Sequence, residues 1–434
     1  MTLHKRPRKI GLLAISPMLL LVVLFLSTGI YFGDFYQVPL TLLFIATATY
    51  ALCITRGHTL HERINYFSKG AGSKNLLFMI WIFVLAGAFA SSAKAMGAID
   101  ASVALTLALL PQQALLGGIF IASCFISMSI GTSVGTIVAL TPVAAALATQ
   151  TGLPIALVVA GTVGGAIFGD NLSFISDTTV VATRTQGLQM SDKFKMNFRI
   201  VLPAALLTCL AYFFMGFSEA PNSTPAAVTL SQIISVIPYL VVLVLAICGI
   251  DVLLVLLVGN LCTGITGVAT GMFDVSGWLA SMGSGISGMG ELILISMLAG
   301  GLLELIRVNG GITYLIRLLT RRVNSVRGAE CCIAALVSLT NLCTANNTIA
   351  ILSVGEISRD IADRYGVDKR RVASILDTCS CIVQSFLPYG AQLLMAAGLS
   401  AISPLQIIPY LYYPMLLMVA VVLSIIFRFP RTKV

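Results

Sequence analysis

One apolar part of this 434-residue chain carries a dense group of polar side chains between positions 170 and 179. The group comprises two carboxylates, one amide and four hydroxyls: Asp170, Asn171, Ser173, Ser176, Asp177, Thr178 and Thr179. An unpaired charge at the centre of a bilayer costs about 2.5–3.5 kcal/mol on insertion scales. These oxygens are therefore expected to face a cavity or to coordinate a cation. Hard oxygen ligands without histidine or thiolate suit Na⁺ or H⁺. For Asp177, an ordinary position at a helix end is the alternative.

A second polar stretch lies about 214 residues further along the chain. Its polar side chains include Asp377, Ser380, Gln384 and Gln392. When Gly152 is aligned with Gly366, the acid Asp170 falls opposite the neutral amide of Gln384. This asymmetry predicts a titrating group in the first stretch and polar substrate contacts in the second. Asp377 aligns with Val163, so we expect it to be a separate coupling residue or else an ordinary residue near a helix start.

Two further groups of small polar residues stand where apolar runs are expected to turn. They are Thr132 and Thr136 in the first group, and Asn346, Asn347 and Thr348 in the second. Helix ends at such turns direct N–H groups at an anion or carbonyl groups at a cation. We expect the two threonines at the ion site, and the two asparagines with Thr348 at the substrate site. Hydroxyls that bond back to the carbonyl four residues earlier are the alternative for the threonines.

The polar groups recur because the chain contains two copies of one unit. Residues 85–87, Leu-Ala-Gly, return at 298–300, and residues 132–140 return in altered form at 344–352. We predict a first repeat over residues 1–217, an external linker over 218–230 and a second repeat over 231–434.

Each repeat is expected to hold its polar residues on two kinds of element. Hairpins are predicted over residues 115–147, turning near 131–133, and over 329–355, turning near 341–347. Interrupted helices are predicted over residues 154–183 and 372–398. Interrupted helices at matching positions of two repeats are the best sequence indication of a transporter binding site.

Composition places these elements in a membrane. The chain is 58% hydrophobic and 10% charged, whereas soluble domains carry about a quarter of charged residues. Several apolar runs approach the roughly 20 residues that a spanning helix needs, which predicts an all-α polytopic membrane protein with roughly 10–14 membrane-embedded helices. The first run, which follows a basic segment, is interpreted as a retained helix rather than a signal peptide.

Lysine and arginine residues predict how the two copies are oriented. Of the 26, all but Lys94 fall in six segments between or beyond the apolar runs. Segments that are basic in one copy carry no basic residue, or only Lys94, in the other. By the positive-inside rule, the copies are inserted in opposite orientations with both termini in the cytoplasm. The net charge of +9 is thus explained by topology in a bacterial-type cytoplasmic membrane, and no nucleic-acid partner is expected.

The polar motif of the first copy resembles that of the NhaC family of Na⁺/H⁺ antiporters, within the wider ion-transporter superfamily. The matching residues are Gly169-Asp170-Asn171-Leu172-Ser173 followed by Ser176-Asp177-Thr178-Thr179, whereas Phe174 stands where the family pattern has proline. The resemblance implies inverted repeats, a scaffold domain, a mobile transport domain and commonly a homodimer. It also implies an ion site formed by Asp170, Asn171, Ser173, Ser176, Asp177 and Thr178.

Two transport functions follow from these patterns. The first is exchange of Na⁺ for H⁺ by alternating access, in which Asp170 holds either ion and Asp170 and Asp177 supply Na⁺ ligands; no cofactor is expected. The alternative is a Na⁺- or H⁺-coupled carrier of a small carboxylate or amino acid, favoured by the amides of the second copy and by substrates of some relatives of the resembled family. An intramembrane aspartyl protease is disfavoured, because Ile167 replaces the first glycine of the expected Gly-x-Gly-Asp motif.

Overall fold

The computed structural model describes residues 11–32, 38–109, 111–173, 176–219, 230–248, 250–320 and 323–430. Within these ranges every regular element is a helix. Eight helices there are long and apolar enough to cross a membrane, or nine if one bent pair counts as a span, and six shorter apolar helices accompany them. The expected all-α polytopic membrane fold is confirmed.

The described residues of the first repeat form ten α-helices. They are α1 (Ser16–Phe32), α2 (Leu40–Ile54), α3 (Leu60–Ala71), α4 (Lys74–Ala95), α5 (Ala98–Leu109), α6 (Leu115–Ile130), α7 (Ser133–Thr151), α8 (Ile155–Leu172), α9 (Asp177–Gln186) and α10 (Met190–Glu219). Short 3₁₀ turns, η1 (Gly11–Ala14) and η2 (Gln112–Ala114), precede α1 and α6.

The second repeat follows the same order. Its helices are α11 (Leu230–Ile247), α12 (Val252–Ala269), α13 (Val275–Gly288), α14 (Gly290–Val308), α15 (Gly311–Thr320), α16 (Val326–Thr344), α17 (Asn347–Tyr365), α18 (Lys369–Phe386), α19 (Ala391–Ser400), α20 (Pro404–Ile407) and α21 (Tyr412–Phe427), with the 3₁₀ turn η3 (Ile408–Tyr410) between the last two. Most of the linker predicted over 218–230, namely residues 220–229, lies outside the described ranges.

Helix starts and caps show the repeat at the level of the backbone. The starts of α7, α8 and α9 recur 214 residues later as the starts of α17, α18 and α19. Gly152 ends α7 with φ 75°, and Gly366 ends α17 with φ 69°. Gly131 ends α6 with φ 74°, and Ala345 ends α16 in the same left-handed region with φ 49°. Both copies therefore turn their hairpins by the same backbone conformation, at the positions where the sequence predicted the turns.

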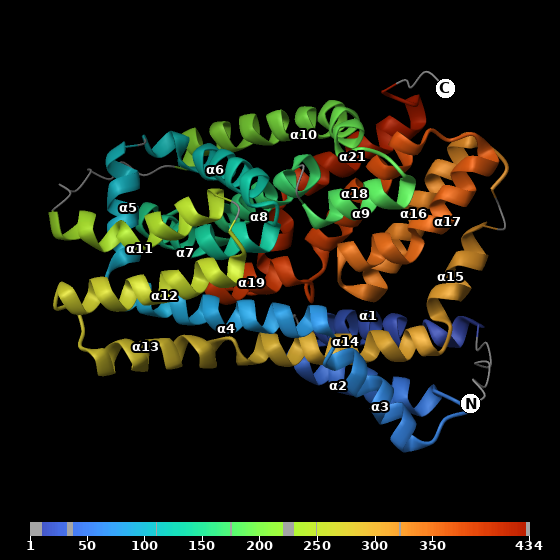
Figure 1. Ribbon diagram of the computed structural model, residues 1–434, viewed down its shortest axis with the longest axis horizontal. Helices are drawn as coiled ribbons and strands as arrows, with labels where there is room; N and C mark the ends of the chain where they lie inside the picture. The colour runs from blue at the N-terminus through green and yellow to red at the C-terminus, as the bar shows by residue number, and fades with distance from the viewer. Residues whose placement is uncertain are drawn as a thin grey trace.

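The two copies run in opposite directions through the molecule. Figure 1 shows the α6–α7 hairpin toward one end and the α16–α17 hairpin toward the other, with their tips directed inward. In the same view, α8 continues toward α9 in the direction opposite to that from α18 to α19. This arrangement confirms inverted repeats, each with a hairpin and a broken helix.

Each broken helix ends near the middle of the molecule at a residue with extended backbone, and in the second copy a proline explains the end. In the second copy, Leu387 is extended, with φ −78° and ψ 108°, because it precedes Pro388, whose ring disfavours helical backbone at the preceding residue. In the first copy, α8 ends at Leu172 and Ser173 is extended, with φ −65° and ψ 141°. Phe174 lies outside the described residues.

The helices form two layers in Figure 1. The lower layer holds α1–α4 and α12–α14, where α4 packs against α12 and α13, and α14 packs against α2 and α3. Gly87 and Gly285 allow α4 and α13 to approach closely, since a Cβ on either would meet the carbonyl oxygen of the other. The upper layer holds the hairpins and broken helices, with α6 and α7 packed on α8, and α10 packed on α21.

Candidate ion-binding site

The two hairpin tips and the two helix breaks meet around one open cavity of about 800 Å³. The polar residues that line it come from both repeats: Thr132, Ser133, Asp170, Ser176, Asp177, Thr178, Asp251, Asn346, Asn347, Thr348, Gln384 and Gln392. Phe78, Met79 and Ile82 of α4 supply an apolar part of the lining. The cavity therefore lies between the upper layer, which provides most of the polar groups, and the lower layer.

Asp170 is the most deeply buried carboxylate in this lining. It lies in the last turn of α8, its residue is 4% exposed, and its Oδ1 accepts a hydrogen bond from the main-chain N–H of Ser133 at 2.9 Å. Ser133 is the first residue of α7, so the carboxylate faces a helix N-terminus, where the helix dipole favours negative charge. The dipole therefore favours the ionised form of Asp170. Among the described residues, no lysine or arginine forms an ion pair with this carboxylate.

A chain of amides connects this carboxylate to the second repeat. Gln392 Nε2 donates to Ser133 Oγ at 3.1 Å, and Gln384 Nε2 donates to Gln392 Oε1 at 2.9 Å and to the carbonyl oxygen of Ala345 at 3.1 Å. Gln384 Oε1 is buried and has no hydrogen-bond partner among the described residues. A buried acceptor without a partner is available to a ligand.

The second hairpin tip presents two asparagines to the cavity. Asn346 caps α17, because its Oδ1 accepts the N–H of Ile349 at 2.9 Å. Asn347 Oδ1 accepts the N–H of Thr348 at 3.0 Å, and its Nδ2 lies 3.8 Å from Cys381 Sγ. Asn346, Asn347, Thr348, Gln384 and Gln392, five of the side chains predicted for a substrate site, thus line the same cavity as Asp170.

Three further predicted residues line the cavity at the start of α9. The hydroxyls of Ser176 and Thr178 are 3.0 Å apart and buried. Asp177 is the first residue of α9 and is exposed. Its position agrees with both interpretations given from the sequence, a cavity carboxylate and a helix-end residue.

Five predicted residues do not contribute to the lining of this cavity. They are Thr136, Asn171, Ser173, Asp377 and Ser380, all of them buried. The hydroxyl of Thr136 bonds back to the carbonyl of Thr132 at 3.2 Å, as the alternative interpretation expected. Ser173 donates to the carbonyl of Met128, and Ser380 to the carbonyl of Asp377.

Asn171 turns away from the cavity. Its Nδ2 donates to the hydroxyl of Tyr413 at 3.1 Å and to the carbonyl of Ile167 at 3.0 Å. Tyr413 is fully buried on α21, in the second repeat. The amide therefore joins the end of α8 to the last helix of the chain.

Asp377 forms a buried ion pair that the sequence did not predict. Its Oδ2 lies 2.8 Å from the Nζ of Lys193, and both side chains are at most 1% exposed. Lys193 belongs to a basic segment interpreted from the sequence as cytoplasmic, and the structure shows that this lysine is buried and paired. The available signal for the pair was Asp377 itself, because a carboxylate in an apolar span is costly without a partner.

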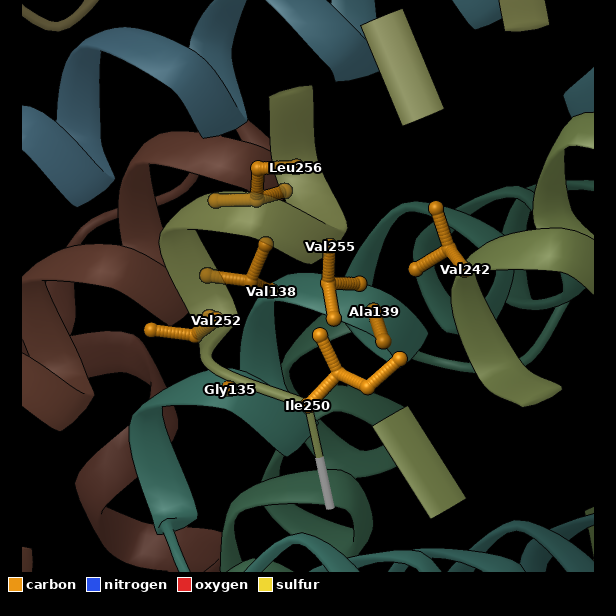
Figure 2. Close-up of a pocket in the computed structure, with 8 residues that line it drawn as sticks. All are labelled: Gly135, Val138, Ala139, Val242, Ile250, Val252, Val255 and Leu256. Carbon is orange, nitrogen blue, oxygen red and sulfur yellow. The ribbon is translucent and has the colours of Figure 1, made fainter. Parts of the chain in front are cut away.

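A small apolar pocket of about 10 Å³ lies beside the site, between α7, α11 and α12. Figure 2 shows Gly135, Val138 and Ala139 of α7 across from Val242, Ile250, Val252, Val255 and Leu256. A space of this size admits about one water molecule and offers it no polar partner. Ile250 and Val252 also line the large cavity, so apolar side chains border the site on this side.

A second open cavity, of about 640 Å³, adjoins the first. Both are lined by Met79, Ala345 and Asn346, so these residues stand between the two spaces. The second cavity also contains the ion pair between Glu304 and Arg307, whose atoms are 3.3 Å apart.

Comparison with known proteins agrees with the family to which the motif around Asp170 points. A family model described as the Na⁺/H⁺ antiporter family matches the chain twice, over residues 8–217 and 217–430. The Na⁺/H⁺ antiporter NhaC of Bacillus subtilis is 23% identical over 399 residues, which cover 83% of this chain and 84% of that protein. The NhaC of Alkalihalophilus pseudofirmus is 25% identical over 304 residues, or 62% of this chain, and the chain spans 64% of that relative's length.

A third relative has a different named activity. The malate-2H⁺/Na⁺-lactate antiporter of Bacillus subtilis is 21% identical over 439 residues, which cover 93% of this chain and 92% of that protein. The two matches to the family model together cover almost the whole length of this chain. The chain belongs to the Na⁺/H⁺ antiporter family.

Proposed function

We propose that this membrane transporter exchanges Na⁺ for H⁺ across the cytoplasmic membrane by alternating access. The observation that carries the proposal is the position of Asp170, whose carboxylate accepts a hydrogen bond from the N-terminus of α7 in the cavity where both hairpin tips and both helix breaks meet. Such a meeting point of half-helices is where inverted-repeat transporters bind their ions.

The mechanism follows from one carboxylate that takes either of two cations. With H⁺ bound, Asp170 is neutral; with H⁺ released, its negative charge attracts Na⁺. The cavity supplies further oxygens for Na⁺ from Asp177, Thr132 and the unpartnered Oε1 of Gln384. Because a bare charge in the membrane is costly, the carrier changes its facing state only when a cation occupies the site.

The orientation and assembly belong to the same proposal. Both termini are placed in the cytoplasm, because all basic segments then lie on that side. The protein is proposed to act as a homodimer with no cofactor besides the transported ions.

The exchange is tested in inverted membrane vesicles. We expect Asp170→Asn to abolish the Na⁺-dependent dequenching of a pH-gradient dye, because an amide cannot exchange a proton. The matched control is Asp363→Asn, which removes an exposed carboxylate paired with Lys369 and should leave dequenching unchanged. Full exchange by Asp170→Asn would contradict the proposal.

A second candidate function is the coupled transport of a small carboxylate or amino acid. The amide-rich wall formed by Asn346, Asn347, Gln384 and Gln392 and the cavity of about 800 Å³ favour it, since a bare ion needs neither. The similarity to a malate and lactate antiporter gives the first solutes to test. The test measures uptake of labelled malate, lactate or an amino acid driven by a Na⁺ gradient in proteoliposomes. Uptake that is lost in Gln384→Leu would support this function. Exchange of Na⁺ for H⁺ with no effect of any solute would contradict it.

A further inference from the structure

A second buried polar cluster lies between α8, α9, α10 and α18, centred on the ammonium of Lys193. The ammonium donates to the main-chain carbonyl of Asn171 at 2.7 Å, to Thr179 Oγ1 at 2.6 Å and to Asp377 Oδ2 at 2.8 Å. An ammonium group has three N–H donors, and all three are used. Asn197 Nδ2 donates to the same carbonyl of Asn171 at 2.9 Å and to the same Asp377 Oδ2 at 2.8 Å.

The fold does not need this cluster for its packing, because the other repeat fills the same positions with aliphatic side chains. Each residue is related by 214 positions to its counterpart: Lys193 to Ile407, Asp377 to Val163, Thr179 to Leu393 and Asn197 to Leu411. The four aliphatic residues are fully buried in one hydrophobic core. A buried ion pair carries a large desolvation cost that apolar residues of similar volume avoid.

Polar residues at positions where the other repeat holds buried aliphatic residues point to a role in transport. Intramembrane charged residues mark ion pathways by default. This pair lies one residue from the proposed exchange site, since the carbonyl that Lys193 contacts belongs to Asn171, the neighbour of Asp170.

The groups around the ammonium are those that bind a small hard cation. They comprise a carboxylate, a main-chain carbonyl and a hydroxyl, and such oxygens suit Na⁺. The carbonyl belongs to the last turn of α8, where carbonyls lack intrahelical partners and the helix dipole favours positive charge. Asn197 Oδ1 is buried, has no hydrogen-bond partner among the described residues, and supplies one more oxygen.

We propose that Lys193 is a tethered cation that occupies a second Na⁺ site and so limits the protein to one exchangeable Na⁺. The inference rests on the proposed exchange at Asp170. With Lys193 paired to Asp377, Asp170 is the buried carboxylate of this region that remains to be neutralised by a transported ion. Without the ammonium, the charge of Asp377 needs a new partner, and the vacated oxygens fit Na⁺.

Equilibrium binding of ²²Na⁺ to the purified full chain tests this idea. Four proteins are compared: the wild type, Lys193→Ala, the double variant Lys193→Ile with Asp377→Val, and Lys195→Ala as matched control. Lys195 is an exposed lysine two residues along the same helix. We expect Lys193→Ala to bind one Na⁺ per chain more than the wild type. The control and the double variant, which copies the aliphatic residues of the other repeat, should gain none.

The outcomes separate this inference from the exchange at Asp170. Equal binding by Lys193→Ala and the wild type overturns the second site and leaves the exchange intact. A wild type that binds no Na⁺, beside a Lys193→Ala protein that binds one, contradicts the exchange and supports the second site. Lys193→Ala is purified in NaCl, because the added Na⁺ should balance Asp377. If it fails to fold there while the double variant folds, the second site is overturned.

Discussion

The two fully or nearly buried aspartates at the centre of the molecule are stabilised in different ways. Asp170 accepts a hydrogen bond from a helix N-terminus and lines an open cavity, so an ion can reach it. Asp377 is paired with Lys193 and does not line that cavity. This difference is the basis for the proposed exchange at Asp170 and for the proposed internal charge balance at Asp377.

The amide chain makes a prediction about ion affinity. In Gln392→Leu, the links to Ser133 and Gln384 are both lost, and one intramolecular hydrogen bond is worth about 0.5–1.5 kcal/mol. The two bonds together are worth about 1–3 kcal/mol, so we expect the Na⁺ concentration for half-maximal exchange to rise roughly five- to hundredfold. Rates of Na⁺-dependent proton release over a Na⁺ titration measure this shift. The control is Gln150→Leu on α7, whose side chain is exposed; an equal shift in both variants would refute a specific role of Gln392.

Part of the site was predictable because aligning the two repeats pairs residues that are far apart in the sequence. Aligning two glycines is enough to place Asp170 opposite Gln384, and both line one cavity. Lys193 was not predictable in the same way. Basic residues indicate topology as a group, whereas the direction of one side chain depends on packing. On α10, Lys193 is buried and Lys195, two residues later, is exposed.

Among the elements, the hairpins and broken helices are the parts best predicted by sequence. The tips lie at Gly131 and Ala345, within the turns expected near 131–133 and 341–347. The pair α11–α12 is different, because hydropathy identifies two apolar runs and does not say how deep the turn between them lies. Figure 1 shows this turn midway along the molecule, and Asp251, its N-cap residue for α12, lines the cavity.

Close packing of α6 on α8 fixes the position of Asp170, which leads to a second prediction. A Cβ at Gly169 would clash with the side chain and backbone of Ser127, and overpacking of this kind costs about 1–3 kcal/mol. We expect Gly169→Ala to lower the melting temperature in detergent and to displace the neighbouring carboxylate, with loss of most exchange activity.

The matched control is a glycine whose replacement by alanine is expected to raise stability instead of lowering it. Gly283 lies in α13, and a Cβ there meets nothing within 4 Å. Replacing such a helical glycine by alanine stabilises by about 0.5–1 kcal/mol. Gly283→Ala should therefore melt slightly higher and exchange normally. A Gly169→Ala protein that behaves like Gly283→Ala would show that the α6–α8 contact does not position the site.

At the scale of the whole molecule, the site lies at the boundary between two layers. Polar groups of the upper layer face Met79 and its neighbours on α4 across the cavities. Met79 lines both cavities, so a passage between them would run beside this side chain.

A bulky side chain at this point should block the passage. We expect Met79→Trp to reduce exchange more than tenfold by filling space between the cavities, with a change in melting temperature below that of Gly169→Ala. Exchange in proteoliposomes and thermal unfolding in detergent measure the two effects. Leu77→Trp is the control, because Leu77 is exposed on the same helix and lines neither cavity. Normal exchange by Met79→Trp would mean that ions do not pass between the cavities.

A one-methyl difference between the two hairpin tips makes the halves energetically unequal. Gly131 adopts its left-handed conformation freely, whereas the Cβ of Ala345 makes the same conformation cost about 1–2 kcal/mol. A carrier of inverted halves that were chemically identical would rest equally often open to either side of the membrane. In this protein the turn at Ala345 carries a strain that the turn at Gly131 lacks, so the two halves are not energetically equivalent. Equal occupancy of the two facing states therefore does not follow from the inverted repeats alone.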